Sequence, residues 1–271
     1  MAISPASLIK ILNTLLNTDL YRYPGFGLEF GISSEDKLQH SSLHGIVVSP
    51  FVNLKLAVFM KKQRLNAAIS ILPFPVLSSN PPFSTENYEL LRSFVTNDYT
   101  TFVLSEQWIY SPVGAMNYFM QTLSISNLKS KILDLSEEDQ VTIWETNDLS
   151  PDDFLSTLSL LSSKWFAYLS SSKLLSPFVL WPKSLSFKDI TRLKSEGVRT
   201  VFSFVYDSAS IRHFKHSQMT YIFLDVWEFC NIALRKFAQV LQLEVDVPVF
   251  HFPQELPTWV SSKDFNVNKV S

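Results

Sequence analysis

Short apolar runs alternate with amphipathic segments along most of the chain. Apolar residues recur at helical spacing from Pro5 to Leu16, and Ser4 precedes a proline that suits the first helical position. Gly45–Ser49 is a continuous apolar run, which predicts a buried strand. Farther along, Ser150 precedes Pro151 and two aspartates, a typical helix start. The chain therefore carries signals for both helices and strands, in alternation.

The alternation predicts an α/β protein, because strands that follow helices of this length form layered sheets. We expect helices at residues 5–16, 53–64, 84–95, 114–123, 151–165, 186–197 and 226–242, and strands at 45–49, 67–72, 100–104, 141–145, 177–181, 198–205, 220–225 and 245–252. The segment 128–140 carries six charges and is interpreted as a connection. One domain over 1–271 is predicted, with lobes 1–127 and 141–271.

Composition narrows the class of protein. The 271 residues are 46% hydrophobic and 14% aromatic, which suffices for a large core and argues against disorder. The net charge is −2, and Lys and Arg are scattered, so no nucleic-acid partner is expected. No apolar run reaches the length of a membrane span, so no membrane association is expected. The N-terminus lacks the pattern of a secretory signal, so a cytoplasmic location is expected.

Few residues have the pattern of a reactive or metal-binding site. Cys230 is the only cysteine and lies on an amphipathic segment without an evident histidine partner, so a buried apolar role is expected. His213 and His216 could share one helix face, which is half of a metal site or a solvated surface. Asp225 and Glu228, at a strand-to-helix junction, fit either a ligand site or a helix N-cap.

Four segments, in order along the chain, resemble the Nif-three-like family, which is also described as the type 2 form of GTP cyclohydrolase I. Residues 23–31, YPGFGLEFG, are similar to the family stretch W-D-N-x-G-L-x-x-G. Residues 68–76 occupy the place of a strand that ends in H-H-P-L. Residues 106–117 resemble H-T-x-L-D-x-x-x-G-G-x-N, and residues 225–230 resemble G-H-x-x-T-E before a helix. The resemblance implies two packed α/β lobes with mixed sheets.

Several departures from these motifs fall on residues that, as the resemblance implies, hold metal in the family. The resemblance implies a pair of divalent metals bound by His and carboxylate side chains, a class of site that activates water. At the matching positions this chain has Pro73, Phe74, Glu106, Tyr110, Val226 and Cys230. Most of these cannot ligate a divalent cation. We therefore expect no catalytic residues, no metal and no cofactor.

Three hypotheses follow. The first is a metal-free, non-catalytic binding or scaffold protein with protein partners; the resemblance implies a ring-shaped homo-oligomer, a hexamer in the family. The second is a hydrolase similar to GTP cyclohydrolase I type 2, in which a divalent metal pair is held by relocated ligands among His213, His216, Asp225, Glu228 and Glu106. The third is an accidental resemblance, which would leave an unassigned α/β domain.

Overall fold

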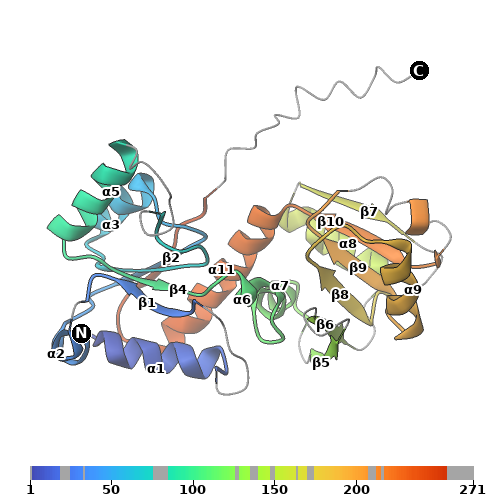
Figure 1. The fold of residues 1–271 in the computed structure, drawn as a ribbon, viewed down its shortest axis with the longest axis horizontal. Helices are drawn as coiled ribbons and strands as arrows, with labels where there is room; N and C mark the ends of the chain where they lie inside the picture. Colours follow the sequence, from blue (N-terminus) through green and yellow to red (C-terminus); the bar gives the residue numbers. More distant parts are fainter. Residues whose placement is uncertain are drawn as a thin grey trace.

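The computed structural model describes residues 2–18, 25–32, 34–75, 85–125, 128–134, 140–146, 150–162, 164–169, 174–206, 212–214 and 217–254. Two sheets organise these residues, one in each half of the molecule (Figure 1). The strands are β1 (Gly27–Phe30), β2 (Ile46–Ser49), β3 (Ala67–Ser70), β4 (Thr100–Val103), β5 (Lys129–Asp134), β6 (Gln140–Glu145), β7 (Trp165–Tyr168), β8 (Phe178–Trp181), β9 (Thr200–Ser203), β10 (Thr220–Leu224) and β11 (Val249–His251). The α/β class predicted from the sequence is confirmed.

Both sheets are mixed. The first has the order β1-β4-β3-β2-β11, in which β4, β3, β2 and β11 are parallel and β1 is antiparallel at the edge. The second has the order β5-β6-β8-β9-β10-β7, with a parallel centre of β8, β9 and β10. Because parallel strands have both faces covered, β2, β3, β8 and β9 are buried at every residue. This is why they appear in the sequence as continuous apolar runs.

Helices cover these sheets and fill the space between them. They are α1 (Pro5–Leu15), α2 (Glu35–His40), α3 (Leu54–Gln63), α5 (Thr85–Thr96), α6 (Gln107–Tyr110), α7 (Ala115–Thr122), α8 (Pro151–Leu161), α9 (Phe187–Ser195) and α11 (Val226–Glu244). Local capping explains several starts: Ser4 and Asn53 accept backbone N–H groups, and Ser186 forms a capping box with Asp189. None of the helices in the described ranges is long and apolar enough to cross a membrane.

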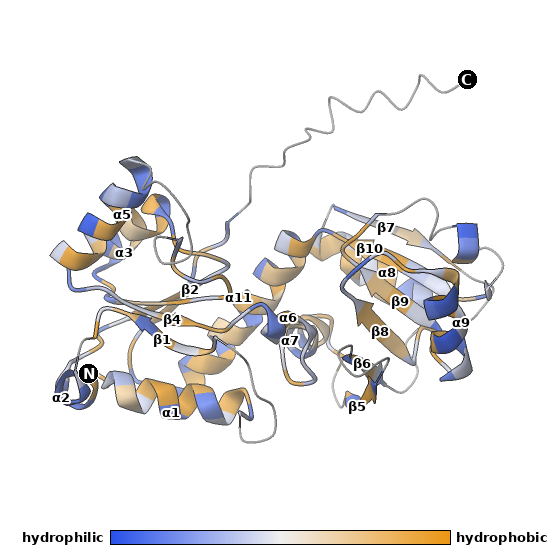
Figure 2. Cartoon of the chain, viewed as in Figure 1, coloured by the Kyte–Doolittle hydropathy of each residue, from blue (hydrophilic) through white to orange (hydrophobic). Residues whose placement is uncertain are grey.

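One hydrophobic core joins the two halves. It includes Val48 and Phe102 from the first sheet, Leu180 and Phe202 from the second, and the buried face of α11. Figure 1 places α11, α6 and α7 between the sheets, and Figure 2 shows hydrophobic residues along α11 while α2 and α9 are largely hydrophilic. Smaller clusters lie under α3 and α5 and beside α9. The shared core makes the long helix the element that connects both sheets.

The topology corrects the predicted lobes in two places. The segment 128–140 is not only a connection, because its first half forms β5, which pairs with β6 from Lys129 opposite Glu145 to Asp134 opposite Gln140. The C-terminal residues also do not stay with the second lobe, because β11 pairs with β2 of the first sheet. The physical reason is α11, a helix of 19 residues, which carries the chain back across the core.

Candidate functional site

The carboxyl ends of β2, β3 and β4 and the start of α11 come together near the centre of the molecule. This is the edge of a parallel sheet where α/β proteins usually bind ligands. The ring of Phe51, after β2, lies edge-on to the ring of Trp227 in the first turn of α11, with centroids 5.9 Å apart. Gln254, almost fully buried, donates from Nε2 to Ser49 Oγ at 2.6 Å and to the carbonyl of Phe51 at 2.5 Å. The family metal-site positions follow these same strand ends.

The position after β3 is filled by an aromatic ring. Phe74 has no exposed surface, and its ring stacks on Phe30 with a centroid distance of 5.0 Å. The ring of Phe94 meets it edge-on at 5.0 Å. The preceding Pro73 is exposed. Packed rings therefore occupy the space beside β3 at Phe74, which with Pro73 makes up the two positions that the sequence resemblance matches to histidines.

A glutamate from β1 binds the backbone of this position. The N–H of Phe74 donates to both carboxylate oxygens of Glu29, at 2.7 and 2.8 Å. The pairing of β1 with β4 shifts register between Leu28 and Phe30, so Glu29 occupies a β-bulge. Burial raises the pKa of Glu29, and the bond from Phe74 partly opposes this effect. Sequence reasoning missed Glu29, because a bulge leaves no periodic signal.

The position after β4 carries an exposed acid and a half-buried phenol. Glu106 precedes α6, is exposed, and makes no side-chain cap to that helix. Tyr110 packs against the central core, 6.1 Å from the ring of Phe204. Burial raises the pKa of Tyr110 to about 12, with smaller contributions from Cys230 and Glu106. Tyr110 therefore stays a neutral phenol near neutral pH.

The start of α11 supplies apolar packing. Val226 packs against the central core, and Cys230 lies inside it with no exposed surface. Burial, and secondarily the charge of Asp225, raises the pKa of Cys230 far above its usual range. A cysteine binds metal as a thiolate, and this environment disfavours the thiolate. The expectation of a buried apolar role for Cys230 agrees with its surroundings.

Asp225 and Glu228, at the junction of β10 and α11, accept hydrogen bonds from neighbouring protein groups. Asp225 accepts the N–H groups of Trp227 at 3.0 Å and Glu228 at 2.9 Å, which is an N-cap. Glu228 accepts the hydroxyl of Ser162 and the N–H of Lys164, the latter at 3.1 Å. The sequence left open a ligand site or a helix N-cap for Asp225 and Glu228, and these hydrogen bonds match the N-cap.

The histidine pair lies elsewhere. His213 contacts the ring of Phe187 at the start of α9, with centroids 5.6 Å apart, in the half of the molecule built on the second sheet. His216 lies outside the described residues. Across the part of the chain that the structure describes, no group of three or more His, Cys, Asp or Glu side chains could hold a metal ion. The candidate ligands that are described therefore do not form a metal site there.

The dinuclear metal centre implied by the family resemblance does not fit these residues. A divalent ion needs several unprotonated donors within coordination distance. The matching positions instead supply a buried ring at Phe74, a neutral phenol at Tyr110, an aliphatic chain at Val226 and a buried thiol at Cys230. Glu106 is the one carboxylate among them.

The motif residues that do match the family have backbone roles. A Cβ at Gly31 would overlap the carbonyl oxygen of Tyr99, and Gly31 has φ +101°, which favours glycine. A Cβ at Gly114 would overlap the carbonyl oxygen of Trp108. Asn117 donates from Nδ2 to the carbonyl of Pro112 at 2.5 Å and closes the loop before α7. These residues maintain the path of the chain.

His251 gives a testable pH dependence. It lies on β11, and its buried Nε2 has no hydrogen-bond partner among the described residues. Burial, aided by the nearby Arg235, lowers the pKa of His251 to about 4. The unfolded chain then binds a proton more readily than the folded one between about pH 6.5 and 4, so folded stability falls as the pH drops through this window. We expect a loss of about 3 kcal/mol from this group.

Urea unfolding at pH 7.0 and pH 4.5 measures this effect. His251→Gln removes the titrating group and should shrink the loss of stability between the two pH values. His40→Gln, at a largely exposed residue that pairs with Asp36, is the matched control and should leave the loss unchanged. An equal pH dependence in the wild type and His251→Gln would contradict the assignment.

Comparisons with known proteins give the fold. No protein-family model matches the sequence, and the search of curated proteins finds no match. Solved structures do match. Staphylococcus aureus hypothetical protein SA1388 superposes with a TM-score of 0.70 at 10% identity over 96% of this chain and 100% of that chain. Reduced HcgD from Methanocaldococcus jannaschii gives 0.67 at 14% identity, over 93% and 98% of the two chains.

A Bacillus cereus protein related to NIF3 gives a TM-score of 0.64 at 8% identity, over 95% of this chain and 98% of that chain. The likeness spans nearly the whole of each protein, so the complete two-sheet arrangement is shared. This chain therefore has the NIF3-type fold. The recognition made from four short motifs is confirmed at the level of the fold, and the two-lobed mixed-sheet architecture with it.

Proposed function

We propose that the chain is a divergent member of the NIF3 superfamily that works without the dinuclear metal centre, as a binding or scaffold protein and not as a catalyst. One observation carries the proposal. Phe74, which the sequence resemblance matches to a histidine, has a fully buried ring stacked on Phe30. A side chain in this position leaves neither a ligand nor space for a hydrated ion.

The contrast between two sets of motif residues supports the same proposal. Two positions that match the family motifs, Gly31 and Gly114, have no room for a Cβ. The positions that differ include those that the resemblance matches to metal ligands. Apolar groups there also avoid burying unpaired charges, which is costly inside a protein. The pattern is what a chain would show if it needed the fold without the metal chemistry.

A metal-dependent hydrolase with relocated ligands is the alternative that the sequence left open. It requires ligands among His213, His216, Asp225, Glu228 and Glu106 to converge, of which His216 lies outside the described residues. In the described residues Asp225 caps α11, Glu228 binds Ser162, and His213 contacts Phe187. None of these observations favours the alternative.

Metal analysis of untagged protein, purified without chelator, tests the proposal. We expect less than about 0.1 equivalent each of Mn, Fe, Co, Ni and Zn per chain, also after incubation with excess metal and gel filtration, because too few donors converge. One or two equivalents that survive gel filtration would contradict the proposal. Glu106→Gln and His213→Gln would then show whether relocated ligands hold the metal.

The scaffold role predicts self-association. A homo-oligomer, a hexamer as the resemblance implies, would present several copies of one binding surface. Light scattering at several protein concentrations measures the assembly. If the protein is a monomer at all concentrations, the scaffold role is contradicted and only the binding role of the proposal is retained.

A further inference from the structure

A second site candidate lies between the end of β1 and the end of α5, on the other side of the Phe30 and Phe94 rings that pack on Phe74. It is a pocket of about 340 Å³ whose walls include Glu29, Phe30, Phe94, Val95 and Asp98. Gly31 forms part of the same wall and cannot carry a Cβ, because that atom would overlap the carbonyl oxygen of Tyr99. The backbone of the wall is therefore held tightly against β4.

The charges of the pocket have one sign. Glu29 and Asp98 are both acids, and none of the described lining residues is a Lys, Arg or His. Among the described residues, no ion pair to Glu29 or Asp98 is found. A pocket whose charged lining residues are all carboxylates attracts cations.

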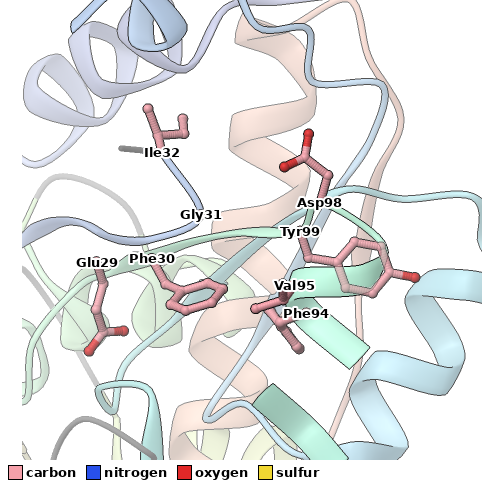
Figure 3. A pocket seen from close by; sticks show the side chains of 8 residues that line it. All are labelled: Glu29, Phe30, Gly31, Ile32, Phe94, Val95, Asp98 and Tyr99. Atoms are coloured by element: carbon pink, nitrogen blue, oxygen red, sulfur yellow. The ribbon is translucent and has the colours of Figure 1, made fainter. Parts of the chain in front are cut away.

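The two acids lie at opposite ends of an apolar strip. Figure 3 shows the Glu29 carboxylate on one side of the Phe30 ring and the Asp98 carboxylate on the other, beyond Tyr99. Phe30 and Phe94 contribute rings in an edge-on pair at 6.1 Å. Val95 forms an exposed part of the rim. Methylene groups pack well on such a strip, and ammonium groups are attracted to ring faces as well as to carboxylates.

The bulge in β1 creates this arrangement. Without the register shift between Leu28 and Phe30, the side chains of Glu29 and Phe30 would point to opposite faces of the sheet. Figure 3 shows the two side chains extending to the same side, and Phe30 contacts Phe94 of α5. The carboxylate is then half-buried and held by the N–H of Phe74. It keeps lone pairs for a further donor.

We propose that this pocket binds a linear aliphatic polyamine, with one ammonium group at Glu29, a second at Asp98, and the methylene chain along Phe30 and Val95. The proposal requires no metal ion, although Glu29 is held by the backbone N–H of Phe74. A ligand charged at both ends and apolar between them matches the order acid, ring, acid along the pocket. A ligand with a single ammonium group would satisfy only one end.

Isothermal titration calorimetry at low salt tests the site with spermidine, α,ω-diamines of increasing length, and n-butylamine. We expect spermidine to bind roughly tenfold or more tightly than n-butylamine, because a second charge-assisted contact is made. The diamines should show an optimum length, since the two carboxylates are a fixed distance apart. Equal affinity for n-butylamine and spermidine would overturn the proposal.

Three variants locate the binding. Glu29→Gln keeps an oxygen that can accept the Phe74 N–H but loses the charge, and Asp98→Asn changes an exposed side chain with little risk to folding. Each should weaken spermidine binding by about tenfold. Glu89→Gln removes a carboxylate from the exposed surface of α5, outside the pocket, and should change binding by less than about twofold, because exposed charges interact weakly.

Two outcomes would overturn the assignment. One is equal weakening by all three variants, which would show that spermidine responds only to the net charge. The other is binding of an acetylated dilysine peptide but not of spermidine, which would show that the pocket takes side chains of a polypeptide. If Glu29→Gln unfolds, Asp98→Asn alone decides the question.

Discussion

Phe74→His lowers the free energy of unfolding by about 3 kcal/mol, although it restores the residue type that the family resemblance implies at this position. The ring of Phe74 has no exposed surface and contacts Phe30 and Phe94 at 5.0 Å. An imidazole is smaller and polar, so it leaves unfilled volume and brings nitrogen atoms that find no partner among these rings. The backbone N–H of residue 74 already binds Glu29, so that carboxylate is engaged.

Chemical denaturation of the wild type and the variant measures the loss. The same substitution at an exposed phenylalanine, Phe187→His, is the control and should change stability by less than about 1 kcal/mol. A Phe74→His protein as stable as the wild type would mean that the position accepts an imidazole. Tight packing would then not be the reason that residue 74 is a phenylalanine and not a histidine.

Gly114→Ala lowers stability by about 3 kcal/mol or more. The added methyl group would overlap the carbonyl oxygen of Trp108 and the hydroxyl of Ser111. Trp108 cannot easily move away, because it is fully buried and packs against Tyr118 and Phe237 at centroid distances of 5.9 and 5.8 Å. The loop before α7 would have to rearrange.

Gly197→Ala provides the matched comparison. Gly197 has φ +81°, but a methyl group added there would meet no atom within 4 Å, so its substitution costs only the strain of a left-handed backbone, about 1 kcal/mol. Thermal and urea unfolding of the two variants separate lack of space from backbone strain. Equal losses at the two glycines would show that the Trp108 loop yields, and that Gly114 is not needed for space.

The results for Gly114→Ala and Phe74→His would together separate motif positions that maintain the backbone from positions that pack the core. Gly114 belongs to the same stretch as Glu106 and Tyr110, where the ligands differ from the family pattern. A severe effect of Gly114→Ala would show that this stretch still determines the fold. A severe effect of Phe74→His would show that the neighbouring ligand position has acquired a packing role. The protein then depends on the motif for its architecture and on the replacements for its core.

The sequence by itself determined the elements with strong local signals. The capped starts at Ser4, Asn53 and Ser186 and the buried runs of β2, β3 and β8 lie where the sequence predicts them. Caps and burial on both faces leave a local pattern, because they depend on residues that are close in the chain. The residue types at the family metal positions are likewise evident from the sequence alone.

Only the tertiary structure decided which strands form the sheet edges and which residues contact Phe74 and Cys230. The edge strands β1, β5 and β7 were not predicted; β5 is exposed at most of its residues, so it lacks the continuous apolar run of the buried strands. The return of β11 to β2 and the bond between Glu29 and Phe74 join residues far apart in the chain. Periodicity carries no information about such pairings, since partner and register depend on the packed core. Packing also decides that Cys230 faces hydrophobic neighbours in the central core and Phe74 faces them in the cluster under α3 and α5.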